Sequence, residues 1–183
     1  AEKGILLIFD EVQTGLGRTG KLFAWEHFGV KPHIMTVAKG LGGGFPVGAL
    51  LAREEAAVFA PGDHQSTFGG NPLACAAVLA CLEEMVKKDL PGRAAALGAE
   101  IAAQIRSWQE EIGIIRELRG MGLLLGLEIE GRAPDYAEAA LARGLLLNAV
   151  NETTLRIAPP LTITREELAE AMAILHAVLA GDK

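Results

Sequence analysis

Short, mostly apolar runs separated by glycine or charged residues open the chain. They cover residues 5–9 (ILLIF), 34–38 (IMTVA) and, less regularly, 47–52. Runs of this length between turn-forming residues are typical of strands that are buried on both faces of an α/β sheet. Residues 22–28 and 53–61 are expected to form short helices between the strands. The first part of the chain therefore predicts an α/β fold.

The pattern becomes helical after the third run and changes again further on. Residues 73–88 and 93–111 are alanine-rich helices on either side of Pro91 and Gly92. Strands are then expected at 114–118, 123–129, 145–150 and 154–158, with a helix at 135–143. Thr164 and Glu167 form a capping box at the start of a last helix that runs to about residue 179. We predict two domains, α/β over residues 1–111 and α+β over residues 112–183.

Composition and charge exclude several classes of partner. The chain has 183 residues, half of them hydrophobic, with 17 Lys and Arg against 23 Asp and Glu. It has no long basic run and no apolar stretch of membrane-spanning length, so nucleic acid and membrane are not expected as partners. Its first residues do not resemble a signal peptide. We expect a cytoplasmic protein whose cysteines, Cys75 and Cys81, are free and buried.

The strongest chemical signal is Lys39, directly after the run at 34–38 and next to glycine-rich sequence. A lysine at the end of a buried strand is costly unless its ammonium is paired or used chemically. Desolvation there would free the amine as a nucleophile for a carbonyl, whereas the alternative is a lysine that reaches the surface. The surrounding glycines favour the close approach of a ligand.

Asp10 ends the run at 5–9 in the same way. Strand carboxyl ends are where open α/β sheets bind ligands, although a carboxylate there can also be purely structural. An aspartate can hold the protonated ring nitrogen of a pyridinium cofactor. Together, Lys39 and Asp10 are the minimal pair for a pyridoxal-phosphate enzyme.

A literal G-x-G-x-x-G, formed by Gly15, Gly17 and Gly20, raises the alternative of a dinucleotide site. Its context argues against that site. Residues 11–14 separate it from the strand, and no acidic residue follows at the distance that would hold a ribose. A tight loop is favoured. The histidines form no ligand-spaced pair, so no metal site is expected.

Two further segments could bind anions. Ser66 and Thr67 precede a Gly-Gly-Asn-Pro sequence, which suits a phosphate contact and equally suits a helix start with Asn71 as the N-cap. Arg156 lies in an apolar strand, where it could clamp a substrate carboxylate or form an internal salt bridge.

Four separated motifs resemble the class III pyridoxal-phosphate-dependent aminotransferases: IFDEVQTGLGRTG, TVAKGLGGGFPVGA, STFGGNPLACAA and LRIAPPLTIT. The resemblance covers essentially the whole chain and is strongest to the acetylornithine aminotransferases. Ornithine, succinyl-diaminopimelate and 4-aminobutyrate aminotransferases are the alternatives. The resemblance implies part of a fold-type-I large domain with a mostly parallel sheet at residues 1–111, and the small C-terminal domain at 112–183.

The resemblance also implies roles around the cofactor, pyridoxal 5′-phosphate. Asp10 would pair with the pyridine nitrogen, Val12 would pack on one face of the ring, and Gln13 would hydrogen-bond near its phenolic oxygen. Lys39 would form the Schiff base and then move the proton during transamination.

Thr67 would reach the cofactor phosphate of a neighbouring subunit, which implies a homodimer. Arg156 would clamp the α-carboxylate of amino-acid and 2-oxo-acid substrates. Two positions depart from the usual family pattern: His33 replaces an aspartate and Gln65 replaces a glycine.

The motifs that members of this family carry upstream are absent, so the chain resembles the C-terminal half of such an enzyme. We expect an exposed sheet edge, exposed apolar surface and weak cofactor binding by this chain alone. A non-catalytic fragment and a nucleotide-binding module are the remaining alternatives.

Overall fold

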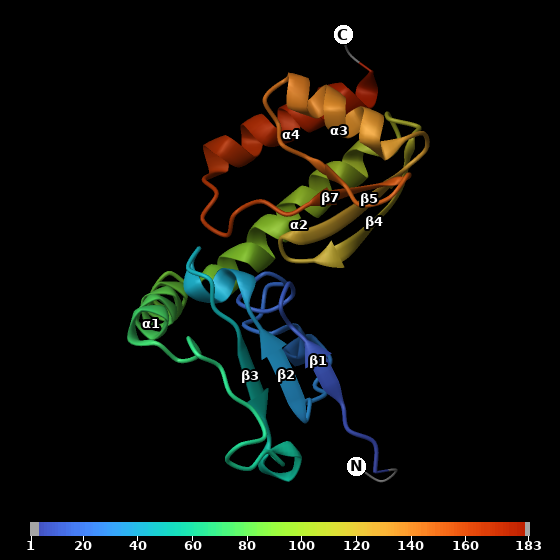
Figure 1. Ribbon diagram of the computed structural model, residues 1–183. Helices are drawn as coiled ribbons and strands as arrows, with labels where there is room; N and C mark the ends of the chain where they lie inside the picture. The colour runs from blue at the N-terminus through green and yellow to red at the C-terminus, as the bar shows by residue number, and fades with distance from the viewer. Residues whose placement is uncertain (1–3, 182–183) are drawn as a thin grey trace. The chain divides into compact units, whose positions relative to one another are not determined.

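The computed structural model describes residues 4–181 and divides the chain into two compact units, Ala1–Pro91 and Gly92–Lys183 (Figure 1). Both units combine helices and strands, which confirms the α/β class. The first three residues, where no signal peptide is expected, lie outside the described residues.

The N-terminal unit is built on a three-stranded sheet in the order β1-β2-β3. Strands β1 (Ile8–Asp10) and β2 (Ile34–Val37) are parallel, and β3 (Ala49–Ala52) is antiparallel to β2. The described part of this sheet is therefore mixed, whereas a mostly parallel sheet was expected. Its helices, in chain order, are the 3-10 turns η1 (Ala24–His27), η2 (Lys39–Gly42) and η3 (Glu54–Ala56) and the helix α1 (Pro72–Lys87).

Helix α1 begins as the sequence predicts. The side chain of Asn71 is the N-cap and accepts a hydrogen bond from the backbone N–H of Ala74 at 2.9 Å, with Pro72 at the first helical position. The prediction of buried cysteines is wrong for Cys75, which is exposed on this helix, while Cys81 is half-buried.

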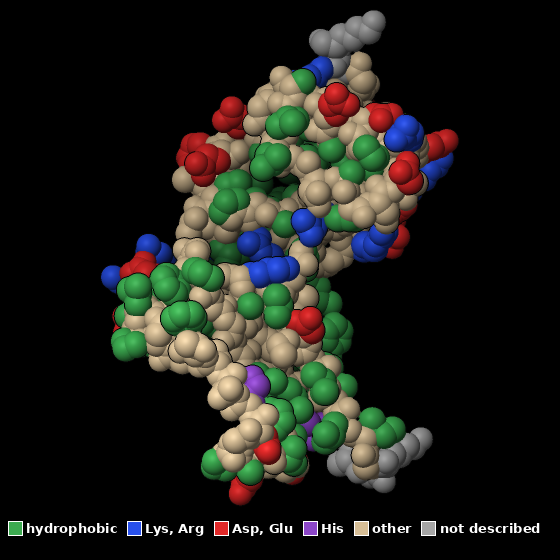
Figure 2. Space-filling view, viewed as in Figure 1, with side chains coloured by type: hydrophobic (Ala, Val, Ile, Leu, Met, Phe, Trp, Pro, Cys, Tyr) green, Lys and Arg blue, Asp and Glu red, His purple; other side chains and the backbone are tan. Residues whose placement is uncertain are grey.

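Apolar side chains of the N-terminal unit remain open to solvent, including those of the predicted core strands. Ile8 and Leu50 are each 58% exposed, and Figure 2 shows hydrophobic side chains gathered over the strands and α1. The strands are therefore not buried on both faces within this chain. The expected exposure of apolar surface is confirmed.

The C-terminal unit has an antiparallel four-stranded sheet in the order β4-β5-β7-β6. The strands are β4 (Ile115–Met121), β5 (Leu124–Ile129), β6 (Asn148–Ala149) and β7 (Thr154–Ile157), and the helices are α2 (Leu90–Trp108), α3 (Ala133–Ala142) and α4 (Arg165–Ala180). One contiguous core joins the sheet to α2 and α4. The capping box at the start of α4 is present, with the N–H of Glu167 donating to Thr164 Oγ1 at 3.1 Å.

Helix α2 shows why the two units divide earlier in the chain than the predicted boundary at residue 112. The apolar stripe of α2, which includes Leu97, Ile101 and Ile105, is almost fully buried in the core of the C-terminal unit. Gly98 lets the helix approach closely, because a Cβ there would lie 2.1 Å from the carbonyl oxygen of Gly122. Packing thus assigns to the second unit a helix that the sequence pattern placed with the first.

Candidate active site

The parallel pairing of β1 and β2 brings the carboxyl ends of both strands to one edge of the sheet. Asp10 pairs with Thr36 in the register, and the Thr36 hydroxyl donates to Asp10 Oδ1 at 3.0 Å. The N–H of Val12 donates to the same oxygen at 3.0 Å. Asp10 is exposed, and its second oxygen has no partner among residues 4–181. The carboxylate is held through one oxygen and offers the other to a ligand.

Lys39 begins η2, separated from the end of β2 by Ala38 alone. Its backbone is left-handed, with φ at 49°. That conformation costs a non-glycine residue about 1–3 kcal/mol and is found preferentially at functional sites. The side chain is exposed and makes no hydrogen bond or ion pair with any described residue. The expected burial of Lys39 is therefore not found within this chain, and its amine is available.

The glycine-rich turn after Lys39 is fixed by α1. Gly43 has φ at 58°, and a Cβ there would lie 2.4 Å from the sulfur of Cys81. Glycine at this position satisfies both the left-handed backbone and the close approach of the helix. Backbone hydrogen bonds from Leu41 to Ala38 and from Gly43 to Gly40, at 3.0 and 3.2 Å, complete the turn. The strained backbone of Lys39 is thus held by its surroundings.

Glu11 is a residue whose importance the sequence reasoning missed. It is only 2% exposed, and its carboxylate accepts hydrogen bonds from the N–H groups of Ala24 and Trp25, at 3.1 and 2.9 Å. The hydroxyl of Thr14 donates to it at 2.5 Å. These bonds tie the start of η1 to the segment that carries Asp10. The sequence does carry a signal for this role. Glu11 comes directly after a strand, and Thr14, which can donate to its carboxylate, follows three positions later.

The loop that contains Gly15, Gly17 and Gly20 folds on itself. The three amides donate to Glu11 O, Leu22 O and Gly17 O at 3.0 to 3.1 Å. Gly17 and Gly20 have φ at 82° and 93°, as the tight-loop interpretation requires. Because these amides are already used, they are not free to bind a pyrophosphate. The geometry argues against the dinucleotide alternative.

The other predicted cofactor residues lie in the same unit. Val12 is half-buried and Gln13 is exposed, both directly after Asp10. Thr67 lies in an exposed loop before α1 and makes no hydrogen bond with any residue that the structure describes. The structure therefore groups Asp10, Val12 and Gln13 on one segment but gives Thr67 no contact that fixes its role.

Arg156 lies on β7 in the C-terminal unit, between Gly126 of β5 and Asn148 of β6. It is half-buried and makes no hydrogen bond or ion pair within residues 4–181. The alternative of an internal salt bridge is therefore not supported. Arg156 borders a hollow of about 520 Å³ that is lined mainly by apolar residues of segments 145–148 and 157–163 and of α4. A guanidinium in such a setting can bind a carboxylate with two hydrogen bonds.

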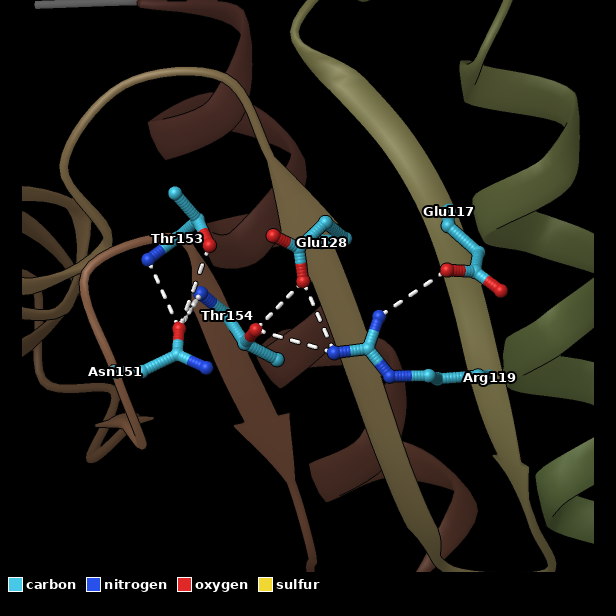
Figure 3. A network of polar contacts seen from close by, with 6 residues as sticks. All are labelled: Glu117, Arg119, Glu128, Asn151, Thr153 and Thr154. Atoms are coloured by element: carbon cyan, nitrogen blue, oxygen red, sulfur yellow. Dashed lines mark hydrogen bonds and ion pairs between the residues drawn. The ribbon is translucent and has the colours of Figure 1, made fainter.

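A second arginine on the same sheet contacts two carboxylates (Figure 3). Arg119 Nη2 donates to Glu128 Oε2 at 3.0 Å and to the Thr154 hydroxyl at 3.2 Å, and Nη1 donates to Glu117 at 3.2 Å. The hydroxyl side chains of Thr153 and Thr154, followed by the Arg119 guanidinium, lower the pKa of Glu128 to about 2. The hydrogen bond to Glu128 in turn raises the pKa of Arg119.

Within residues 4–181, no cluster of at least three His, Cys, Asp or Glu side chains is suited to a metal ion. No helix in that range has the length and apolar character needed to cross a membrane.

Comparison with known proteins identifies the family of this chain. The Aminotransferase class-III family model matches residues 1–179. The chain belongs to the class III aminotransferases. Members of this family depend on pyridoxal 5′-phosphate.

Two curated relatives illustrate the similarity. The chain is 51% identical over 180 residues to the acetylornithine aminotransferase of Caldanaerobacter subterraneus and 46% identical over 180 residues to that of Bacillus subtilis. Each alignment covers 98% of this chain and 46% of the relative. The chain thus spans about half the length of these curated relatives.

Solved structures show the same relationship. The acetylornithine aminotransferase from Elizabethkingia anophelis matches with a TM-score of 0.92 at 39% identity, covering 98% of this chain and 49% of that one. The ornithine aminotransferase from Toxoplasma gondii ME49 matches with a TM-score of 0.94 at 36% identity, covering 98% and 44%.

The residues present fit the family's cofactor. The free oxygen of Asp10 can accept a hydrogen bond from a protonated ring nitrogen. The amine of Lys39, unpaired among the described residues, can react with an aldehyde. Both groups lie at one sheet edge.

Proposed function

We propose that the whole protein transfers the amino group of N-acetylornithine, or of a similar acylated or ω-amino diamino acid, to 2-oxoglutarate. The products would be the semialdehyde and glutamate, as a step of arginine biosynthesis. The observation that carries this proposal is the strained Lys39, whose amine has no partner within residues 4–181, at the same sheet edge as the anchored Asp10. The acetylornithine aminotransferases among the relatives support the choice of substrate.

Each residue at this edge has a distinct task. When bound, pyridoxal phosphate supplies an electron sink for the carbon that carries the substrate's amino group. Asp10 keeps the ring nitrogen protonated, Val12 packs against the ring, and Gln13 orients its phenolic oxygen. Lys39 would hold the cofactor through its amine, and the same amine would serve as the base that moves the proton at the reacting carbon.

Thr67 and Arg156 complete the proposal. The hydroxyl of Thr67 would bind the cofactor phosphate of a neighbouring subunit, so the active form would be a homodimer. The guanidinium of Arg156 would clamp a substrate carboxylate, because no described residue neutralises it and it borders a mainly apolar hollow.

Ornithine is the second candidate donor. An ornithine aminotransferase of Staphylococcus aureus is 49% identical over 169 residues. Solved ornithine aminotransferases also match this chain closely in fold.

Lys39→Ala tests the proposal in the whole protein. We expect turnover to fall by about 10²–10⁴-fold or more, because this replacement removes both the covalent anchor and the general base. Steady-state assays with 2-oxoglutarate and several amino donors measure it. Lys21→Ala, which removes an exposed lysine of the same unit, is the matched control. Unchanged turnover in Lys39→Ala would refute the role of this residue, and acetylornithine no better than 4-aminobutyrate would refute the substrate.

A further inference from the structure

Arg119 and Arg156 occupy the same row of the C-terminal sheet but differ in their partners. Gly126 of β5 pairs with Arg119 on one side and with Arg156 on the other. Arg119 contacts two carboxylates, those of Glu117 and Glu128. Arg156 has no carboxylate partner within residues 4–181.

Glu128 lies close enough to pair with Arg156. It is directly opposite Thr154, and Arg156 is two positions further along the same strand, so their side chains share one face of the sheet. Diagonal neighbours on antiparallel strands are about 7–8 Å apart, which long side chains can bridge. A free Glu128 carboxylate would therefore compete with any external carboxylate for Arg156.

The contacts in Figure 3 hold Glu128 away from this alternative partner. Its Oε2 accepts hydrogen bonds from Arg119 at 3.0 Å and from the Thr154 hydroxyl at 2.6 Å. Thr154 is itself only 3% exposed, and its N–H donates to Asn151 Oδ1 at 2.8 Å. Arg119 on β4 and Thr154 on β7 together thus fix the position of the Glu128 carboxylate.

We propose that Arg119 is a positioning residue for substrate binding: by holding Glu128, it keeps Arg156 free for the substrate carboxylate. This inference rests on the proposed role of Arg156. Without Arg119, the Thr154 hydroxyl would still contact Glu128 but would not neutralise its charge. The uncompensated carboxylate would then turn to Arg156 and occupy the guanidinium with an internal carboxylate of the same chemistry as the substrate's. Substrate binding, and not the chemical step, would then be weakened.

The test compares Arg119→Met with the double variant Arg119→Met/Glu128→Gln in the whole protein. In Arg119→Met, we expect the KM for 2-oxoglutarate to rise about tenfold or more while kcat changes less than about threefold. In the double variant the KM should return to within about threefold of the starting value, because the neutral amide cannot pair with Arg156 as a carboxylate does. Arg116→Met is the matched control. Arg116 lies on the same strand as Arg119, and its replacement breaks only an exposed ion pair with Glu130.

A second readout does not depend on turnover. The dissociation constant for glutarate, a dicarboxylate that cannot react, is measured by titration calorimetry and should follow the same pattern. Arg119→Gln provides a second variant without the charge if Arg119→Met fails to fold. An increase in KM that Glu128→Gln does not reverse would mean that Arg119 acts only on stability, and would overturn the inference.

Arg156→Met separates this inference from the proposed function. If Arg156→Met leaves the KM and glutarate binding unchanged, the carboxylate role of Arg156 is wrong. If Arg156→Met weakens both but Arg119→Met does not, the role of Arg119 alone is refuted.

Discussion

The two units of this chain differ in how completely they bury their own apolar side chains. In the C-terminal unit, α2, α4 and one face of the sheet enclose residues such as Leu127 and Leu155, both 0% exposed. In the N-terminal unit, strand residues such as Ile8 and Leu50 remain more than half exposed. The C-terminal unit is closed by its own packing, and the N-terminal unit is not.

This difference concerns function as well as stability. Lys39 and Asp10 belong to the open unit, next to apolar surface of a kind that proteins normally bury against other polypeptide. Arg156 belongs to the closed unit, where the sheet register fixes its position. The proposed cofactor residues therefore need further contacts to become a closed site, whereas the surroundings of Arg156, the proposed substrate arginine, are already formed within its own unit.

Replacing a core leucine gives the largest expected effect on stability. Leu127→Ala should lower the free energy of unfolding of the C-terminal unit by about 2–5 kcal/mol, because a cavity replaces a fully buried side chain. Leu50→Ala, at a position 58% exposed, should change that of the N-terminal unit by less than about 0.5 kcal/mol. Hydrogen exchange with mass spectrometry follows each unit separately. Equal losses would contradict the contrast.

Gly98→Ala tests the close packing of α2. Alanine normally favours a helix over glycine by about 1 kcal/mol, but a Cβ here would lie 2.1 Å from Gly122 O. We therefore expect a loss of about 1–3 kcal/mol in the unfolding free energy of the C-terminal unit. Gly113→Ala is the control, because nothing lies within 4 Å of the added Cβ. Stabilisation by Gly98→Ala would show that the contact is not tight.

Helix caps should affect both units alike. Thr164 caps α4 and Asn71 caps α1, each by accepting a hydrogen bond from a backbone N–H of the first turn. Replacement of either by alanine should cost its unit about 1 kcal/mol, because the bond is local and independent of core closure. Chemical denaturation measures the loss, and Thr162→Ala, at an exposed position just before α4, is the control. A loss in one unit only would contradict this prediction and would mean that the two units also differ at their helix ends.

Glu128 gives the smallest expected change, and one that depends on pH. Its pKa falls from 4.5 to about 2 in the folded chain, with the Thr153 and Thr154 hydroxyls as the largest causes. A depressed carboxylate pKa stabilises the fold fully above the unfolded value and loses this contribution as the pH falls toward the folded one. The stability advantage of the native chain over Glu128→Gln should therefore shrink between about pH 4.5 and about pH 2.

Trp108 provides the measurement for this prediction, because it lies in the core of the C-terminal unit. Urea unfolding is followed by its fluorescence in a Trp25→Phe background, at about pH 6 and about pH 3. Parallel losses in the native chain and Glu128→Gln would contradict the assigned pKa.

Local sequence patterns predicted much of the fold and part of the site. The strands, the alanine-rich helices and the capping box at Thr164 follow from periodicity and from residues only a few positions apart. The edge shared by Asp10 and Lys39 follows because the carboxyl ends of parallel strands meet. The antiparallel direction of β3, the early division of the units and the burial of Glu11 were not predicted.

The sequence by itself determined the family, much of the secondary structure and the identity of the lysine and aspartate at the sheet edge, because neighbouring residues carry that information. Only the tertiary structure decided which unit holds α2, what holds Glu11, and that Arg119 is paired with carboxylates while Arg156 has no such partner within residues 4–181. These outcomes depend on contacts between segments far apart in the chain. A side chain's partner is set by the strand that lies beside it, and the residues next to it in sequence do not reveal that strand.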